Sequence, residues 1–192
     1  MRARLLRFAA ALLGLCPVTA RAAEPVVVDF EQATLIFPDE RPNRVEQWVE
    51  KGVTFKLARE PKKSKAKGLV MFFEHLASGH KGIVCAMALE PIPVRATFPV
   101  PVSSVSVAFW GSTETPAVLE AFDADGKLVD RAALQSVPGR KAPGDPIPIF
   151  TLSVKASVKA PRIVYIEFSG PREGEYLAAD EIRFTPVEGG DR

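Results

Sequence analysis

The stretch FDADGKLVD, residues 122–130, places three aspartates and a glycine together, as a metal-binding loop would. A calcium loop of the EF-hand type needs oxygen ligands at alternate positions, a glycine at the sixth and a glutamate at the twelfth. Counted from Asp123, the glycine comes fourth and Leu134 stands twelfth, so the pattern fails. Asp125 and Gly126 instead suit a two-residue type I′ turn between the strand-like flanks AVLEAF and KLVDR. We therefore predict a hairpin turn here, without a metal.

Acidic residues also mark the first and last strand-like segments. VVVDFEQ places Asp29 and Glu31 on one side of a strand, and YLAADEIRF places Asp180 and Glu181 just before an alternating strand. A β-sandwich often pairs its first and last strands, which would bring these carboxylates together. With nearby carbonyls they could hold calcium, which prefers six to eight oxygen ligands. The alternative is that they end strands and face water, as acidic residues usually do.

Strand alternation identifies candidate ligand-binding side chains. In SSVSVAFW the alternation places Trp110 on the polar face, and in RIVYIEF it turns Tyr165 and Glu167 away from the apolar set Val164, Ile166 and Phe168. If these two strands are neighbours, Trp110, Tyr165 and Glu167 line one concave surface. There a ring can stack on a sugar, and a carboxylate can accept hydrogen bonds from hydroxyl groups. The alternative is that Trp110 fills one end of the sandwich.

The sequence contains no recognisable catalytic motif. Cys85 lies inside the apolar run GIVCAMA, where burial would keep its thiol inert. His75 and His80 lack the spacing of an HExxH zinc site, and no G-x-S-x-G motif is present. Two acids could converge as a glycosidase pair, but nothing singles out such a pair. We predict a protein without catalytic activity.

Short runs rich in Val, Ile and Phe, separated by Pro and Gly, predict an all-β fold. One weak helical turn is expected near residues 43–50, and Trp48 within it is expected to pack in the core. The predicted strands are 26–30, 52–58, 68–75, 82–88, 94–98, 103–110, 117–123, 127–133, 149–155, 162–168 and 181–187. These elements predict an antiparallel β-sandwich of about ten strands.

The N-terminal residues have the three parts of a secretory signal. Three arginines precede an apolar run, and Ala20-Arg21-Ala22 forms an A-x-A cleavage site. We expect residues 1–22 to be a signal peptide and residues 23–192 one β-sandwich domain. Removal of the signal takes four of the 25 basic residues and no acid, which leaves 21 against 23 acidic residues and a net charge of −2. This balance argues against nucleic-acid binding, and no apolar C-terminal anchor is visible.

The order of several segments resembles that of bacterial jelly-roll domains related to carbohydrate-binding modules and galactose-binding-like domains. The matching segments are VVVDFE, GVTF, ASGHKGIV, TFPVPVSSVSVAFWG, LEAFDADGKLVD, RIVYIEF and DEIRF. The resemblance implies a jelly-roll-like sandwich with a structural calcium ion bound by Glu31 and Asp180 and by carbonyls of the turn from Ser78 to Gly82. The sequence departs from sugar-binding members in its few aromatic residues, with two Trp and two Tyr.

Together these observations predict an exported module, periplasmic or extracellular, that binds a glycan or another cell-envelope polymer. We expect a monomer without a transmembrane anchor. The alternative is a structural or assembly protein that binds another envelope protein, and a third reading is an enzyme on the same scaffold. One fold serves many functions, so the fold alone does not decide among them.

Overall fold

The computed structural model describes residues 23–31, 43–62, 68–73, 81–85, 92–111, 116–135, 148–157, 161–169 and 177–187. Within these ranges the chain forms twelve strands and no helix. The strands are β1 (Val26–Val28), β2 (Asn43–Val45), β3 (Gln47–Glu50), β4 (Val53–Leu57), β5 (Leu69–Phe73), β6 (Lys81–Cys85), β7 (Val94–Gly111), β8 (Ala117–Phe122), β9 (Leu128–Leu134), β10 (Ile149–Lys155), β11 (Ile163–Ser169) and β12 (Leu177–Pro186). No helix in the described ranges is long and apolar enough to cross a membrane.

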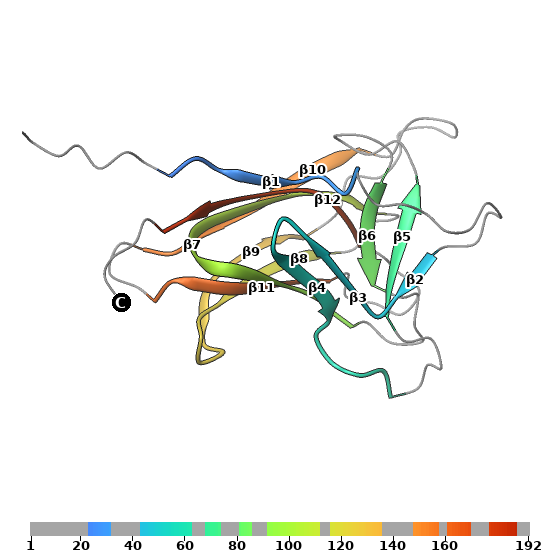
Figure 1. Ribbon diagram of the computed structural model, residues 1–192, viewed down its shortest axis with the longest axis horizontal. Helices are drawn as coiled ribbons and strands as arrows, with labels where there is room; N and C mark the ends of the chain where they lie inside the picture. Colours follow the sequence, from blue (N-terminus) through green and yellow to red (C-terminus); the bar gives the residue numbers. More distant parts are fainter. Residues whose placement is uncertain are drawn as a thin grey trace, which may run out of the picture.

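The strands pair antiparallel and form two layers that share the long strand β7 (Figure 1). Residues 94–97 of β7 pair with β4 and β11, Val102 pairs with β11 and β12, and residues 104–110 pair with β10 and β12. We call β3, β4, the first part of β7, β11, β8 and β9 the first sheet. The second sheet consists of β1, β12, the second part of β7 and β10. Strands β2, β5 and β6 extend it from the edge of β12.

Two prolines mark the point where β7 passes from one sheet to the other. Pro99, Val100 and Pro101 are all exposed there. Proline has no backbone N–H to donate to a β-ladder, so it is tolerated where a strand leaves one set of partners and joins another. The chain therefore changes layers at Pro99–Pro101 without breaking the strand.

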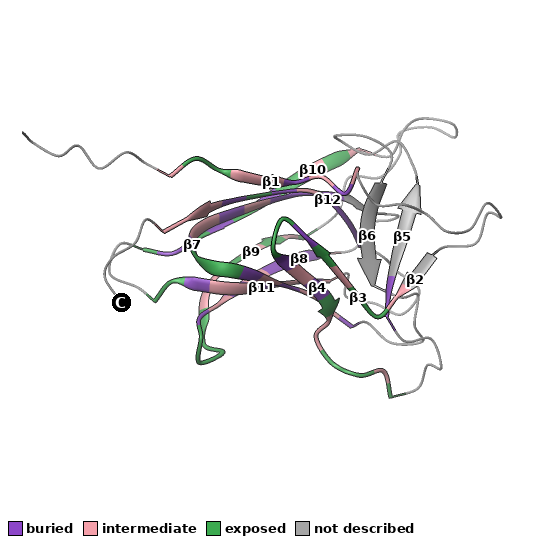
Figure 2. Ribbon diagram, viewed as in Figure 1, coloured by how far each residue is buried: buried purple, intermediate pink, exposed green. Residues whose placement is uncertain are grey.

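The core lies between the inner faces of the two sheets. In β8 every second residue is buried, and β7 buries Val94, Ala96 and Phe98 in its first part and Val105, Val107 and Phe109 in its second. Phe109 packs against Phe150 and Phe168, with ring centroids 5.8 and 5.4 Å apart. Figure 2 shows these buried positions along β7, β8, β11 and β12, whereas the tip of the β8–β9 hairpin is exposed.

The predicted all-β sandwich is confirmed, with two corrections to its elements. The segments 94–98 and 103–110, predicted as separate strands, form the single strand β7. The helical turn predicted near residues 43–50 is wrong, because this segment forms β2 and β3. Strand β3 pairs with β4 through a two-residue turn in which Lys51 and Gly52 have φ angles of 47° and 79°. Positive φ at both positions is the geometry of a type I′ hairpin turn, which makes the segment extended instead of helical.

Candidate binding face

The outer face of the first sheet carries two rows of side chains that cross all of its strands. Directly paired antiparallel residues point to the same face of a sheet, so the register aligns them. Each member of a row below pairs with the next. The charged row consists of Gln47, Lys56, Arg95, Glu167, Glu120 and Arg131. The aromatic row beside it consists of Val49, Thr54, Thr97, Tyr165, Phe122 and Leu128.

Ion pairs compensate most of the charged row. Arg95 donates to Oε1 of Glu167 from Nε at 2.9 Å and from Nη2 at 2.5 Å. Arg131 donates from Nε to Oε1 of Glu120 at 3.1 Å. Glu167 and Glu120 are direct cross-strand partners, and like charges in such positions repel. Each glutamate is compensated by an arginine on its far side, so these four side chains together are neutral.

Tyr165 joins the two rows through a stack of three side chains. Its ring lies nearly parallel to that of Phe122, with an interplanar angle of 14° and centroids 5.0 Å apart. The guanidinium carbon of Arg95 lies 4.3 Å from the centroid of the Tyr165 ring. Phe122 and Arg95 come from strands on opposite sides of β11, so they cover opposite faces of the tyrosine ring. The stack thus offers a ligand ring edges, the tyrosine hydroxyl and the guanidinium group instead of a free ring face.

The predicted turn between β8 and β9 is confirmed and borders this stack. Oδ1 of Asp123 accepts hydrogen bonds from the N–H groups of Asp125 and Lys127 at 3.0 and 2.8 Å. The predicted turn type is wrong, because of these two residues only Gly126 has a positive φ, at 77°. The N–H of Gly126 donates to the carbonyl of Asp123, as in a type I turn followed by a left-handed glycine. A Cβ at position 126 would lie 3.4 Å from the Tyr165 hydroxyl, so the turn closes one side of the stack.

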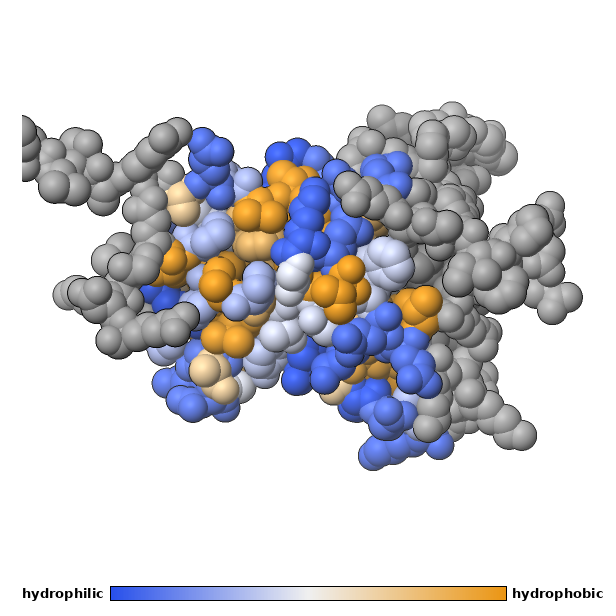
Figure 3. Space-filling view, viewed as in Figure 1, coloured by the Kyte–Doolittle hydropathy of each residue, from blue (hydrophilic) through white to orange (hydrophobic). Residues whose placement is uncertain are grey.

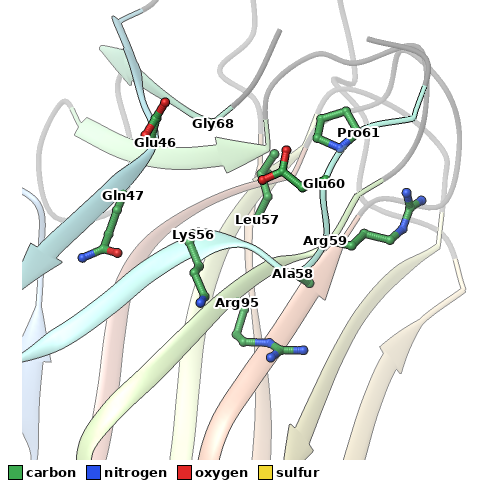
Figure 4. Close-up of a pocket in the computed structure, with 10 residues that line it drawn as sticks. All are labelled: Glu46, Gln47, Lys56, Leu57, Ala58, Arg59, Glu60, Pro61, Gly68 and Arg95. Atoms are coloured by element: carbon green, nitrogen blue, oxygen red, sulfur yellow. The ribbon is translucent and has the colours of Figure 1, made fainter. Parts of the chain in front are cut away.

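A pocket of about 470 Å³ adjoins the other end of the charged row (Figure 4). Lys56 and Arg95 lie on one side of it, and the carboxylates of Glu46 and Glu60 lie toward the other. Arg59 also lines it, in the segment that follows β4 and forms a hydrophilic projection in Figure 3. A concave, charged pocket beside an open sheet face is suited to polar ligands.

The structure brings two of the three predicted ligand-binding residues together and separates the third. Tyr165 and Glu167 face outward from β11 and share the partner Arg95. Trp110 is also on β7, but it pairs with Ile149 and Ala178, whereas Tyr165 pairs with Thr97. At a rise of about 3.3 Å per residue, Trp110 is roughly 40 Å from Thr97 along the strand. The concave surface predicted from all three residues does not form, and a binding role for each remains a prediction.

Asp180 and Gly82 are the predicted metal ligands that lie on paired strands, β12 and β6, and the end of β1, which precedes Glu31, pairs along the same edge of β12. Strand β1 pairs with β12 through Val28 and Ile182, and β6 pairs with it through Ile83 and Ala179. Asp180 lies between these two contacts, where β12 has an irregularity in its register, and is 1% exposed. Gly82 adjoins Ile83 in β6, and Glu31 follows the last paired residue of β1, Val28, by three positions.

The carboxylate of Glu50 accepts two hydrogen bonds, one of them from the segment that follows β1. The N–H of Phe30, which has a φ of 57°, donates to Oε1 of the buried Glu50 at 3.1 Å. Trp48, predicted to be a core residue, is partly buried against the core and donates to Oε2 of Glu50 at 3.2 Å. Ser78 lies outside the described residues. Within the described ranges, no group of three or more His, Cys, Asp or Glu side chains could hold a metal ion. A cation at this edge would therefore need backbone carbonyls in addition to carboxylates.

Lys56, Arg95 and Phe122 were not among the site residues predicted from the sequence. Alternation within GVTFKLA and VRATF already places Lys56 and Arg95 on outward faces. Arg95 lies 72 residues before Glu167 along the chain, and Lys56 lies still earlier. Only the register shows that Arg95 pairs with Glu167 and that Lys56 pairs with Arg95. Phe122 was assigned to a strand, but its outward direction and its stack on Tyr165 depend on the same register.

Comparisons with known proteins support the fold. Neither models of known protein families nor curated protein sequences match the chain. Among solved structures, the K1 cleaved adhesin domain of Lys-gingipain from Porphyromonas gingivalis W83 matches with a TM-score of 0.51 and 10% identity, over 86% of this chain and 99% of that domain. A cyclase from Fischerella sp. TAU matches with a TM-score of 0.50 and 12% identity, over 86% of this chain and all of that one.

A family 29 carbohydrate-binding module from Piromyces equi matches at a TM-score of 0.39 and 12% identity, over 73% of this chain and 95% of that module. The adhesin domain and the cyclase confirm the resemblance to such sandwich domains for the fold. At these identities the similarity concerns the fold and not the activity.

Proposed function

We propose that this protein is an exported, non-catalytic module that binds a glycan or another cell-envelope polymer through the outer face of its first sheet. The observation that carries the proposal is the stack of Phe122, Tyr165 and Arg95 beside the ion pair with Glu167. Apolar ring edges interspersed with charged donors and acceptors match the alternating C–H and hydroxyl groups of a sugar chain. The fold similarity to a domain described as an adhesin domain supports a binding role.

The proposed polymer would cross the strands along the two rows. Neighbouring strands lie about 4.8 Å apart, so the six strands of the first sheet span roughly 24 Å. A track of this length accommodates several sugar units of an extended chain. The ion pairs fix Arg95 and Glu167 before the ligand arrives, which lowers the entropy lost on binding.

A second candidate function, assembly with another envelope protein, is favoured by the two ends of the aromatic row. Val49 and Leu128 are 54% and 47% exposed there. Exposed apolar side chains on an open sheet face can also contact a protein partner. Size-exclusion chromatography with light scattering, and purification from the native envelope, would detect such a complex.

Binding to a panel of insoluble and immobilised polysaccharides tests the proposed function. The mature chain, residues 23–192, should be retained on at least one of them. Tyr165→Ala should weaken retention about tenfold or more, because it removes the centre of the stack. Ser106→Ala, on the outer face of the other part of β7, is the control, and Trp110→Ala tests the predicted role of Trp110 separately. If a folded Tyr165→Ala variant is retained as well as the wild type, the first sheet is not the binding face.

Export is part of the proposal and rests on the signal-like residues 1–22. Expression of the full chain with a cytoplasmic marker, followed by fractionation and N-terminal sequencing, tests it. The expected product begins at Ala23 and is found in the periplasm or the medium. A product that retains its N-terminus in the cytoplasm contradicts export.

The proposed module also binds one structural calcium ion at the edge of β12, through Glu31, Asp180 and carbonyls near Gly82. Buried Asp180, at the irregularity of β12 between the ends of β1 and β6, supports this proposal. A ligand that binds only the folded state raises its stability, so calcium should raise the Tm and a chelator should lower it. Glu31→Gln should abolish the difference, and Glu181→Gln, a neighbouring acid, should retain it. Equal Tm values of the wild type in calcium and in chelator would exclude the ion.

A further inference from the structure

Two positive charges face each other directly at the pocket end of the charged row. Lys56 of β4 pairs in register with Arg95 of β7, and both side chains point outward. Like charges directly opposite each other on neighbouring strands destabilise a sheet. Figure 4 shows both side chains extending to the same side of the pocket. The arrangement is therefore unfavourable for the folded protein alone.

The ion pair with Glu167 offsets part of this repulsion, but the rest of the row supplies no counter-charge for Lys56. Arg95 is engaged by Glu167 through both Nε and Nη2, and Glu120 is engaged by Arg131. No carboxylate of the described residues lies within ion-pair distance of the Lys56 ammonium group, which is exposed. One positive charge of the row is thus uncompensated, and it lies at the mouth of the pocket.

The pocket itself is polarised. Lys56 and Arg95 lie on one side, Glu46 and Glu60 lie toward the other, and Arg59 adds a third cation to its lining. An oxyanion placed against Lys56 and Arg95 would convert their mutual repulsion into two attractive, charge-assisted contacts. The carboxylates across the pocket would accept hydrogen bonds from hydroxyl groups of the same ligand. Carboxylate and hydroxyl groups occur together on the ring of a uronic acid.

We propose that this pocket is a subsite for the carboxylate of an acidic polysaccharide, with Lys56 as its main contact and Arg95 as the second. This inference rests on the proposed function, because the subsite lies at the end of the same track. It makes the ligand of the module a uronic-acid polymer that places its carboxylate beside β4 and its neighbouring sugars along β7, β11 and β8.

A second basin, on the outer face of the second sheet, provides a comparison for the pocket beside Lys56. It measures about 370 Å³ and is lined by Lys155, Arg183 and Asp130 above the small side chains of Ser104 and Ser106. Arg183 forms an ion pair with Glu181. Asp130 also lines the basin and accepts a hydrogen bond from the N–H of Lys155 at 2.7 Å. No two cations are direct cross-strand partners there, so Lys155 is a suitable control residue.

Calorimetric titration with oligogalacturonate and oligoalginate, each beside its carboxyl-reduced form, tests the subsite at fixed ionic strength without added calcium. The wild type should bind an acidic oligomer more tightly than the reduced form of the same length. Lys56→Gln should weaken binding of the acidic oligomer about tenfold and leave binding of the reduced form unchanged. Lys56→Arg should restore most of the affinity, and Lys155→Gln should bind as the wild type does. Circular dichroism and Tm values establish that each variant is folded.

The outcomes separate the two proposals. If the wild type binds reduced and acidic oligomers equally, or Lys56→Gln binds the acidic form as the wild type does, the anionic subsite is excluded and the binding module stands. If Lys56→Gln and Lys155→Gln lose affinity equally, the attraction is only a general effect of charge, and the subsite is again excluded. If the wild type binds neither these oligomers nor any polysaccharide of the panel, the proposed function fails and the subsite fails with it.

Discussion

The two sheets of this sandwich have similar inner faces and different outer faces. Strand β7 shows both, since it belongs to the first sheet and then to the second. Its first part buries Val94, Ala96 and Phe98, and its second part buries Val105, Val107 and Phe109. Outward, the first part carries Arg95 and Thr97, whereas the second carries Ser104 and Ser106. Both parts of β7 bury apolar side chains in the core in the same alternating way. The different side chains on the two outer faces are therefore not required by the packing of the core.

The outer residues of the first sheet are also organised with one another. Arg95, Tyr165, Phe122 and Glu167 form a connected stack and ion pair. On the second sheet the corresponding central residues are short hydroxyl side chains, of which Ser104 donates a hydrogen bond to the hydroxyl oxygen of Thr185 at 3.3 Å. Side chains that are already fixed by mutual contacts lose less entropy when a ligand binds, which supports the proposed binding face. This contrast is the reason why we place the proposed binding function on the first sheet.

The largest expected effect comes from the core that both sheets share. Phe109→Ala removes a fully buried ring that contacts Phe150 and Phe168. The loss of burial and the resulting cavity should lower the free energy of unfolding by about 3–5 kcal/mol. Urea denaturation of the variant measures the change. Ser106→Ala, on the outer face of the same strand, is the control and should stay within about 0.5 kcal/mol of the wild type. A loss below 1 kcal/mol for Phe109→Ala would contradict a common core.

A smaller effect on the free energy of unfolding is expected when an ion pair of either outer face is broken, and it should be larger on the first sheet. Arg95→Gln leaves Glu167, whose side chain is 15% exposed, without its charged partner and should cost about 1–3 kcal/mol. Arg183→Gln breaks a pair in which the arginine is 51% exposed, and exposed pairs contribute about 0–1 kcal/mol. Urea denaturation at low and high salt measures both. Equal losses for the two variants would show that the first sheet holds its charges no more firmly than the second.

Local sequence patterns predicted much of this fold. Alternation identified the outward direction of Tyr165 and Glu167, and burial at Ile166 and Phe168 agrees with it. The predicted apolar set of β11 is wrong at one position, because Ile163 is buried instead of Val164. The cause is a register irregularity of β11 between Ile163 and Tyr165. Alternation depends on residues next to one another in the chain, and for that reason it can be read without a structure.

Register could not be predicted in the same way. The pairing of Tyr165 with Thr97, and not with Trp110, depends on contacts between strands far apart in the sequence. It also depends on β7 continuing past Pro99 and Pro101, where prolines indicated a break. The stack of Phe122, Tyr165 and Arg95 is a product of that register, and so is the pair of Lys56 and Arg95. Site residues on different strands therefore remained invisible until their strands were aligned.

The smallest expected effect tests the turn that borders the stack. Gly126 has a φ of 77°, and a Cβ there would lie 3.4 Å from the Tyr165 hydroxyl, an ordinary contact. Gly126→Ala should therefore cost about 1 kcal/mol through backbone strain, without displacing Tyr165. Gly126→Asn should cost less, because asparagine tolerates the left-handed conformation better. Thermal unfolding measures both variants, and near-ultraviolet circular dichroism reports the environment of Tyr165. If Gly126→Ala is as stable as the wild type, the left-handed turn is contradicted. A changed tyrosine signal would instead show that the turn helps to position the stack. The organised region of the first sheet would then extend to the β8–β9 hairpin.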